Sequence, residues 1–375
     1  MPSPLGRWTA RIVVGAASLF LAVCALEAWL ELSAARRLYR QTRDRFHPFL
    51  QLVPPADLDG VNPDRFRGDA IAVAKPPHTL RIFALGGSTT LGVLNRFADT
   101  YPRLLQQRLQ ARHPGIRIEV ENAGVDWYTT ANSFINYSLR VRRFSPDIVI
   151  VMHAINDLCH GFAPPWLASG PFKPDYSHYL GPEAAILGPN TGLQADYQRD
   201  GWMLWRLLGH AVRRDPWPTG GIDSAARMRT RLRAAPVTTF RSLESFAANY
   251  DLLVREIQSD GHVAIAASEP SLYKDRHSPG EERRLWFAPA FCAEGGIYPD
   301  LDSMRKGMAQ FNGAAKAVAA QRGAAFVDLD AAVPRDLDHF YDDVHMTRAG
   351  NERMAEAVAL WISGHLEGAL PEAER

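Results

Sequence analysis

The sequence predicts an α/β fold in which a parallel sheet lies between layers of helices. From residue 79 onward, short apolar runs recur and helical patterns separate several of them. The expected strands are residues 80–85, 116–120, 148–152, 263–267 and 324–329. The expected helices include residues 101–112, 246–258 and 304–321. Strands that alternate with helices favour a parallel sheet covered by helices on both faces.

An apolar segment near the N-terminus predicts a membrane anchor. From Ile12 to Leu30 the only charged residue is Glu27, and this length suits a tilted membrane helix. Basic residues precede the segment as they do in a signal peptide, but the apolar pattern continues past a possible cleavage site at residues 23–25. We therefore expect residues 1–35 to form an uncleaved anchor.

The orientation of this anchor follows from two opposing considerations. Arginines follow the apolar segment, and counting basic residues alone would place that side in the cytoplasm. Long C-terminal domains are exported largely regardless of such charges. We expect an extracytoplasmic domain, either periplasmic or on the cell surface.

Composition divides the rest of the chain into three parts. Residues 36–78 read as an irregular lead-in, and residues 79–365 as one domain with an insertion at about 160–240. The first half of the insertion is rich in proline, and its second half is basic and looks helical around residues 202–208. The basic stretch could contact anionic lipid or an acidic substrate, although we favour a cap that packs on the domain. A formal charge of +1 gives no reason to expect nucleic acid as a partner.

The three cysteines leave one question open. Cys24 lies in the apolar segment, so Cys159 and Cys292 are the only plausible pair. A disulfide and two separate buried thiols remain equal alternatives.

Polar residues of chemical interest follow the predicted strands. In open parallel sheets, ligands gather beyond the carboxyl ends of the strands, so residues at those ends should meet. The candidates there are Ser88 after a glycine pair, Gly124, Asn156, Asp342 and His345. Each also has an ordinary structural interpretation, such as a helix cap, a turn or a loop histidine.

Together these residues fit the requirements of ester hydrolysis. Ser88 can be the nucleophile, His345 its base, and Asp342 the acid that orients the base from three positions earlier. The backbone N–H groups of Ser88 and Gly124 and the side-chain amide of Asn156 can surround a developing oxyanion. Asp343 is adjacent to Asp342 and could compete as the orienting acid, although spacing favours Asp342.

The ordered motifs resemble those of the SGNH or GDSL-type hydrolases. The four motifs occupy residues 86–89, 122–124, 155–157 and 342–345, in the family's order. The resemblance implies a flavodoxin-like three-layer fold, serine esterase chemistry and the roles given above. Two departures stand out: Gly87 replaces the aspartate of the name-giving motif, and Ala154 stands where glycine is usual.

Several further expectations concern the substrate and cofactors. We expect a carboxylic ester or O-acyl group, possibly acetyl, carried on a small molecule, glycan or lipid. We expect no cofactor, and no metal site because the histidines lack metal-ligand spacing. Trp127, Tyr128 and Phe340 are candidates for the acyl or alcohol pocket and equally for the core. The alternative functions are an O-acyltransferase using the same acyl-enzyme and an inactive binding domain tethered to the membrane.

Overall fold

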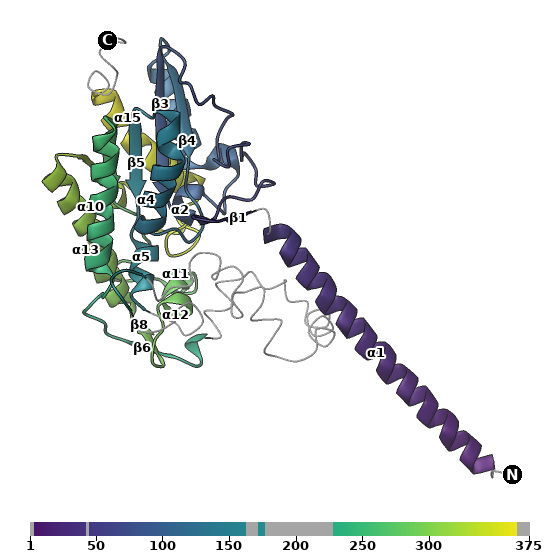
Figure 1. The fold of residues 1–375 in the computed structure, drawn as a ribbon. Coiled ribbons are helices and arrows are strands. Elements are labelled where there is room, and N and C mark those ends of the chain that lie inside the picture. Colours follow the sequence, from purple (N-terminus) through teal and green to yellow (C-terminus); the bar gives the residue numbers. More distant parts are fainter. Residues whose placement is uncertain (1–3, 43–44, 163–171, 177–227, 366–375) are drawn as a thin grey trace. The chain divides into compact units, whose positions relative to one another are not determined.

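The computed structural model describes residues 4–42, 45–162, 172–176 and 228–365 (Figure 1). The chain divides into two compact units, and each is described by itself. One unit contains the N-terminal helix, and the other holds the sheet and begins at Arg45. The helix expected around residues 202–208 lies outside the described residues.

The N-terminal helix α1 spans Pro4–Thr42. Its stretch Arg11–Leu30 contains 20 residues with a mean hydropathy of 2.1, long and apolar enough to cross a membrane. The predicted N-terminal apolar helix is therefore confirmed. The same length and composition also fit a signal sequence.

A five-stranded parallel sheet forms the centre of the second unit. Relative to their order along the chain, its strands lie in the order 2-1-3-4-5, which is the flavodoxin-like order. The predicted fold class is confirmed. From one edge to the other the strands are β4 (Arg117–Asn122), β3 (Thr79–Gly86), β5 (Ile148–Met152), β7 (Val263–Ala267) and β9 (Ala325–Val327).

Four of the five expected strands agree closely with the structure, and the last one was too long. The expected strand 324–329 ends at Val327 because the Asp328 side chain accepts the backbone N–H of Ala331. This contact starts the short helix α14 (Leu329–Ala332). The apolar run therefore crosses the boundary between a strand and a helix.

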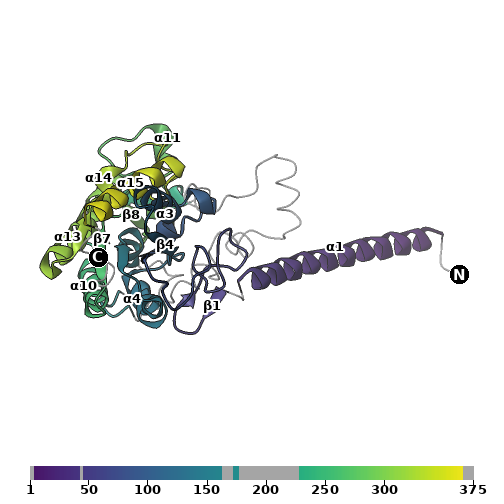
Figure 2. The same ribbon diagram turned by 90° about the horizontal axis from the view of Figure 1, so that it is seen from above.

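Helices cover both faces of the sheet (Figure 2). The helices α3 (Tyr101–Arg112) and α15 (Arg348–Gly364) pack together on one face. On the other face, α10 (Leu243–Ser259) packs against both α4 (Thr130–Leu139) and α13 (Leu301–Arg322). The expected helices 101–112, 246–258 and 304–321 correspond to α3, α10 and α13.

The remaining described elements are short. The helices are α2 (Ser88–Leu91), α5 (Ile155–His160), α11 (Pro279–Glu282) and α12 (Phe287–Phe291), with 3-10 turns η2 (Phe97–Asp99) and η3 (Val141–Phe144). The strands are β1 (Phe46–His47) paired antiparallel with β2 (Gln51–Leu52), and β6 (Arg233–Ala235) paired parallel with β8 (Ile297–Pro299).

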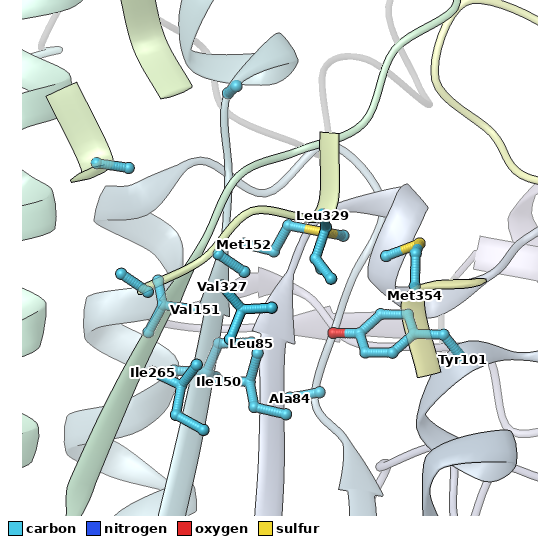
Figure 3. Close-up of a cluster of buried hydrophobic side chains, with 14 of the residues drawn as sticks. Ala84, Leu85, Tyr101, Ile150, Val151, Met152, Ile265, Val327, Leu329 and Met354 are labelled. Atoms are coloured by element: carbon cyan, nitrogen blue, oxygen red, sulfur yellow. The ribbon is translucent and has the colours of Figure 1, made fainter. Parts of the chain in front are cut away.

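The core lies between the sheet and its helices. Every residue of β3 and β5 is buried, which explains why β5 is entirely apolar and why β3 is apolar apart from Thr79 and Arg81. Figure 3 shows side chains of β3, β5, β7 and β9 gathered with Tyr101 of α3 and Met354 of α15. This packing fixes the strands, so the loops at their carboxyl ends start from a rigid platform.

The segment before β3 packs on the same unit. The buried Arg67 guanidinium donates to the carbonyl oxygens of Leu91, Gly92 and Asn95, each at 2.8 Å. These carbonyls belong to the end of α2 and the turn after it. The lead-in therefore holds the chain just beyond Ser88.

Candidate active site

Ser88 is the first residue of α2, directly after the turn that ends β3. The next residues of the helix, Thr89, Thr90 and Leu91, are buried, whereas Ser88 is half-buried. The turn from strand to helix thus presents the Ser88 hydroxyl at the carboxyl edge of the sheet.

The two glycines before Ser88 permit close approaches. A Cβ atom on Gly86 would lie 2.1 Å from Thr90 Oγ1 and 2.8 Å from the carbonyl oxygen of Met152. A Cβ atom on Gly87 would lie 2.6 Å from Asn156 Nδ2. Without side chains at these positions, β3 can end close to β5 and the Asn156 amide can lie beside the turn.

His345 reaches Ser88 from the loop between α14 and α15. Its Nε2 atom lies 2.9 Å from Ser88 Oγ, and its Nδ1 atom lies 2.8 Å from Asp342 Oδ2. Asp342 Oδ1 also accepts the backbone N–H of His345 at 2.9 Å. A carboxylate at Nδ1 favours the tautomer with its proton on Nδ1, which leaves Nε2 free to accept the serine proton. The three side chains form one continuous hydrogen-bonded series.

Electrostatics support a charged Asp342 and a basic His345. Burial opposes ionisation of Asp342, but the charge of His345 and the hydrogen bonds to the carboxylate outweigh it and hold the pKa of Asp342 below its ordinary value. Burial likewise opposes the imidazolium, yet the Asp342 charge and hydrogen bond raise the pKa of His345. His345 is therefore a stronger base than an isolated buried imidazole would be.

The two other predicted oxyanion donors lie beside the turn but already have hydrogen bonds. Asn156 Nδ2 donates to the carbonyl oxygen of Tyr128 at 2.9 Å, which leaves its second hydrogen for another acceptor. The Gly124 N–H donates to Asn122 Oδ1 at 2.9 Å. A Cβ atom on Gly124 would lie 2.6 Å from the backbone nitrogen of Leu91, so this glycine also permits close packing against α2.

Asp343 lies next to Asp342 but makes different contacts. Its carboxylate accepts the Tyr273 hydroxyl and the backbone N–H groups of Trp286 and Phe287. Burial and the negative charge of Asp342 raise the pKa of Asp343 to about 7. Of the two adjacent aspartates, Asp342 is the one hydrogen-bonded to the His345 ring.

A family comparison agrees with this arrangement. The sequence matches the GDSL-like lipase/acylhydrolase family over residues 84–353. The chain belongs to this family. It is therefore a serine hydrolase that acts on ester bonds, as the motifs predicted.

Solved structures include similar but distant proteins. One is LAE5, an α/β hydrolase from the metagenome of Lake Arreo, Spain, with 16% identity and a TM-score of 0.45 over 80% of this chain and 99% of that one. Another is Axe2, an acetylxylan esterase of Geobacillus stearothermophilus, with 17% identity and a TM-score of 0.43 over 75% of this chain and 93% of that one. No curated protein sequence matches.

The three predicted pocket residues of this GDSL-like hydrolase lie in different surroundings. Trp127 is half-buried, and its ring contacts Phe291 with 4.4 Å between centroids. Tyr128 is fully buried, and its hydroxyl donates to the carbonyl oxygen of Leu52 at 2.5 Å. Phe340 is also buried in the core. Trp127 is thus the one of the three that is partly exposed.

Aromatic side chains continue from Trp127 toward the Ser–His pair. Trp286, Phe287 and Phe291 pack on one another, and the Phe287 ring centroid lies 6.0 Å from that of His345. The Trp286 indole N–H also donates to Asp342 Oδ2 at 3.0 Å. Sequence analysis missed Trp286, because it lies far from every motif along the chain and no spacing signals its contact with Asp342.

Glu269 is a second residue near the site that sequence analysis missed. It follows β7 by two residues and is buried, and its carboxylate contacts residues adjacent to Ser88 and Asn156. Its position just beyond the carboxyl end of an expected strand was the available signal.

A disulfide joins two elements of the site. Cys159 of α5 and Cys292 directly after α12 are bonded, which decides between the two alternatives left open by the sequence. The bond ties the helix that carries Asn156 to the aromatic segment near His345.

Among the described residues, no group of three or more histidine, cysteine or acidic side chains is arranged to hold a metal ion.

Proposed function

We propose that this GDSL-like hydrolase cleaves a carboxylic ester or O-acyl group through an acyl-enzyme on Ser88. The single observation that carries the proposal is the series of hydrogen bonds from Asp342 through His345 to Ser88. It joins a strand-to-helix turn to a loop 257 residues away along the chain. The arrangement supplies a nucleophile, a base and an orienting carboxylate in one place.

The first half of the reaction forms the acyl-enzyme. Ser88 Oγ attacks the carbonyl carbon of the ester while His345 Nε2 takes the serine proton, and the C=O electrons move onto the carbonyl oxygen. When the tetrahedral intermediate collapses, the C–O bond to the alcohol breaks and the His345 imidazolium protonates the leaving alkoxide. Asp342 stabilises the imidazolium throughout.

The second half releases the acid. A water molecule attacks the acyl carbon, and His345 takes its proton. Collapse of this second intermediate returns that proton to Ser88 and frees the carboxylic acid. An acceptor alcohol in place of water would make the same intermediate serve an acyltransferase.

We propose that three groups donate hydrogen bonds to the oxyanion: the backbone N–H of Ser88, the second amide hydrogen of Asn156 and the N–H of Gly124. The Gly124 hydrogen is shared with Asn122 Oδ1, so we assign it the smallest contribution. Loss of one well-placed donor typically costs about 3 kcal/mol in the barrier.

The test is a series of p-nitrophenyl esters of rising chain length alongside acetylated sugars, assayed with wild type and Ser88→Ala. We expect hydrolysis by wild type and none above background by the variant. A variant that hydrolyses a short-chain ester at the parental rate would refute the acyl-enzyme on Ser88. Preference for acetyl esters would point to a carbohydrate substrate, and preference for long chains to a lipid. Product analysis with a glycan acceptor would separate hydrolysis from acyl transfer.

We further propose that α1 anchors the chain in a membrane and that the hydrolase domain lies outside the cytoplasm. The disulfide between Cys159 and Cys292 supports this orientation, because such bonds persist in oxidising compartments and are rare in the cytosol. The test is protease added to intact cells, to cells whose outer envelope is permeabilised while the cytoplasm is retained, and to fully lysed cells. Cleavage of the domain in either of the first two would support the proposal, and cleavage only after full lysis would contradict it.

A further inference from the structure

Glu269 makes two hydrogen bonds that reach both sides of the candidate active site. Its Oε1 atom accepts the Thr89 hydroxyl at 2.9 Å, and its Oε2 atom accepts the backbone N–H of Ile155 at 2.9 Å. Thr89 directly follows Ser88, and Ile155 directly precedes Asn156. One carboxylate therefore connects the residue after the proposed nucleophile with the residue before a proposed oxyanion donor.

The two helices that it connects have little rigidity of their own. The helix α2 has four residues and α5 has six, and both lie at the same end of the sheet (Figure 1). Such short helices depend on tertiary contacts for their stability. Neither has a side-chain cap at its N-cap residue, Gly87 or Ala154. Glu269 supplies an acceptor for one of the open N–H groups of α5.

Glu269 is itself held in place by a residue of the helix α13. Its backbone N–H donates to Asn312 Oδ1 at 2.8 Å, and Asn312 Nδ2 donates back to the Glu269 carbonyl oxygen at 3.0 Å. Asn312 lies within the long helix α13. Glu269 is 3% exposed, so water does not compete for the contacts of its carboxylate.

We propose that Glu269 is a positioning residue that sets the separation between the Ser88 hydroxyl and the Asn156 amide. The inference rests on the function proposed for those two groups. The carboxylate joins α2 to α5, and α13 fixes the carboxylate. A displacement of about 1 Å between reacting groups can cost about a hundredfold in rate. The contacts therefore act on the rate of the chemical step and leave substrate affinity nearly unchanged.

The test uses substitutions on both sides of the contact. Glu269→Met removes both acceptors at similar volume, and we expect kcat to fall about a hundredfold with KM changed less than about threefold. Thr89→Val removes one donor and should lower kcat about tenfold. Thr89→Ser keeps the hydroxyl, and Glu269→Gln can keep both contacts through its amide, so these variants should retain most of kcat.

Ser268→Ala is the matched control. Ser268 neighbours Glu269 and is equally buried, but its hydroxyl donates to Asp328 Oδ1 at 2.8 Å and accepts the backbone N–H of Asp330 at 2.9 Å. We expect this variant to lower the melting temperature without lowering kcat per folded molecule. Fluorophosphonate titration of active sites normalises every rate to folded enzyme, so a purely structural loss does not register as a change in kcat.

A double-substitution experiment separates positioning from general stability. In an Asn156→Ala background there is no amide to position, so Glu269→Met should cost several-fold less in kcat than it does in wild type. Equal losses in both backgrounds, or wild-type kcat in Glu269→Met and Thr89→Val, would overturn the inference. Activity retained by Ser88→Ala would instead refute the proposed function on which it rests, so the two failures are distinguishable.

Discussion

Among the described residues, two serine–histidine pairs have an aspartate near the histidine, and only one of the two has the surroundings of a catalytic pair. Ser88 Oγ lies 2.9 Å from His345 Nε2, and Ser133 Oγ lies 2.7 Å from His153 Nε2. An aspartate accompanies each histidine. By the distance between hydroxyl and imidazole alone, the second pair would be the better candidate.

The carboxylate is the first difference between the pairs. Asp342 Oδ2 lies 2.8 Å from His345 Nδ1, within hydrogen-bond distance, whereas Asp157 Oδ2 lies 4.0 Å from His153 Nδ1. Asp157 instead accepts the hydroxyl and backbone N–H of Thr130. Burial raises the pKa of Asp157 to about 7.

Burial is the second difference. Ser133 is fully buried, and burial lowers the pKa of His153 to about 3, so this imidazole stays neutral at physiological pH. Burial also opposes a charge on His345, but there the Asp342 carboxylate outweighs it. The Ser88 pair thus combines a carboxylate on the far ring nitrogen with a partly exposed hydroxyl, and the Ser133 pair has neither. Ser133 and His153 serve to hold α4 against the end of β5.

The largest expected effect separates the two serines. Ser88→Ala should lower kcat/KM by about 10⁴- to 10⁶-fold, because the nucleophile is lost. Ser133→Ala should keep kcat/KM within about twofold and lower the free energy of unfolding by about 1–3 kcal/mol, because a buried imidazole loses its partner. Ester kinetics and urea unfolding measure the two quantities. If Ser133→Ala were as inactive per folded molecule as Ser88→Ala, the assignment of Ser88 rather than Ser133 to catalysis would be refuted.

Replacing Asp342 should lower kcat and replacing Asp157 should not, but the difference should be smaller than that between the two serine variants. Asp342→Ala should lower kcat about 10²- to 10⁴-fold, less than loss of the nucleophile, because its part is to orient and stabilise His345. Asp157→Ala should lower the free energy of unfolding and should not lower kcat once kcat is normalised by active-site titration. Equal kcat for Asp342→Ala and wild type would exclude the carboxylate from the mechanism.

The pH dependence of kcat/KM should show which of the two histidines acts as the base. His345 must be neutral to act as a base, so kcat/KM should rise with pH, and its midpoint should lie above the ordinary histidine pKa of about 6.5. Asp342→Ala removes the charge that stabilises the imidazolium and should move the midpoint to lower pH. His153→Gln should leave the midpoint in place. A midpoint that follows His153 rather than Asp342 would contradict the assignment.

Only a small effect on activity is expected from loss of the disulfide. Replacing Cys159 and Cys292 together with serine should lower the free energy of unfolding by about 2–4 kcal/mol. Neither cysteine contacts the Ser–His–Asp series, so kcat at a temperature where the variant is folded should change by less than about threefold. Thermal unfolding and single-temperature kinetics measure both. A loss of activity as large as that of Asp342→Ala would show that the bond itself shapes the site.

Sequence was sufficient for the sheet and for the order of the site residues. Strands buried on both faces are mostly apolar, so β5 and β7 could be located from hydrophobicity, and β3 could be located despite the buried Arg81 within it. The end of β9 could not, because a capping contact of Asp328 cuts the apolar run. Motif order predicted that Ser88 and His345 meet, and Ser88 Oγ lies 2.9 Å from His345 Nε2.

The contacts that depend on three-dimensional neighbours were not predictable. Glu269 contacts Thr89 and Ile155, which are 180 and 114 residues away along the chain. Trp286 reaches Asp342 from a segment with no motif of its own. Likewise, nothing in the sequence indicates that the buried Ser133–His153 pair lacks a hydrogen bond to a carboxylate.

The most direct test of the account is labelling of the full chain with a fluorophosphonate probe, followed by peptide mapping. We expect a single modified residue, Ser88, with labelling slowed strongly in His345→Ala and unchanged in His153→Gln. Labelling of Ser133, or labelling of Ser88 at the same rate with and without His345, would contradict it.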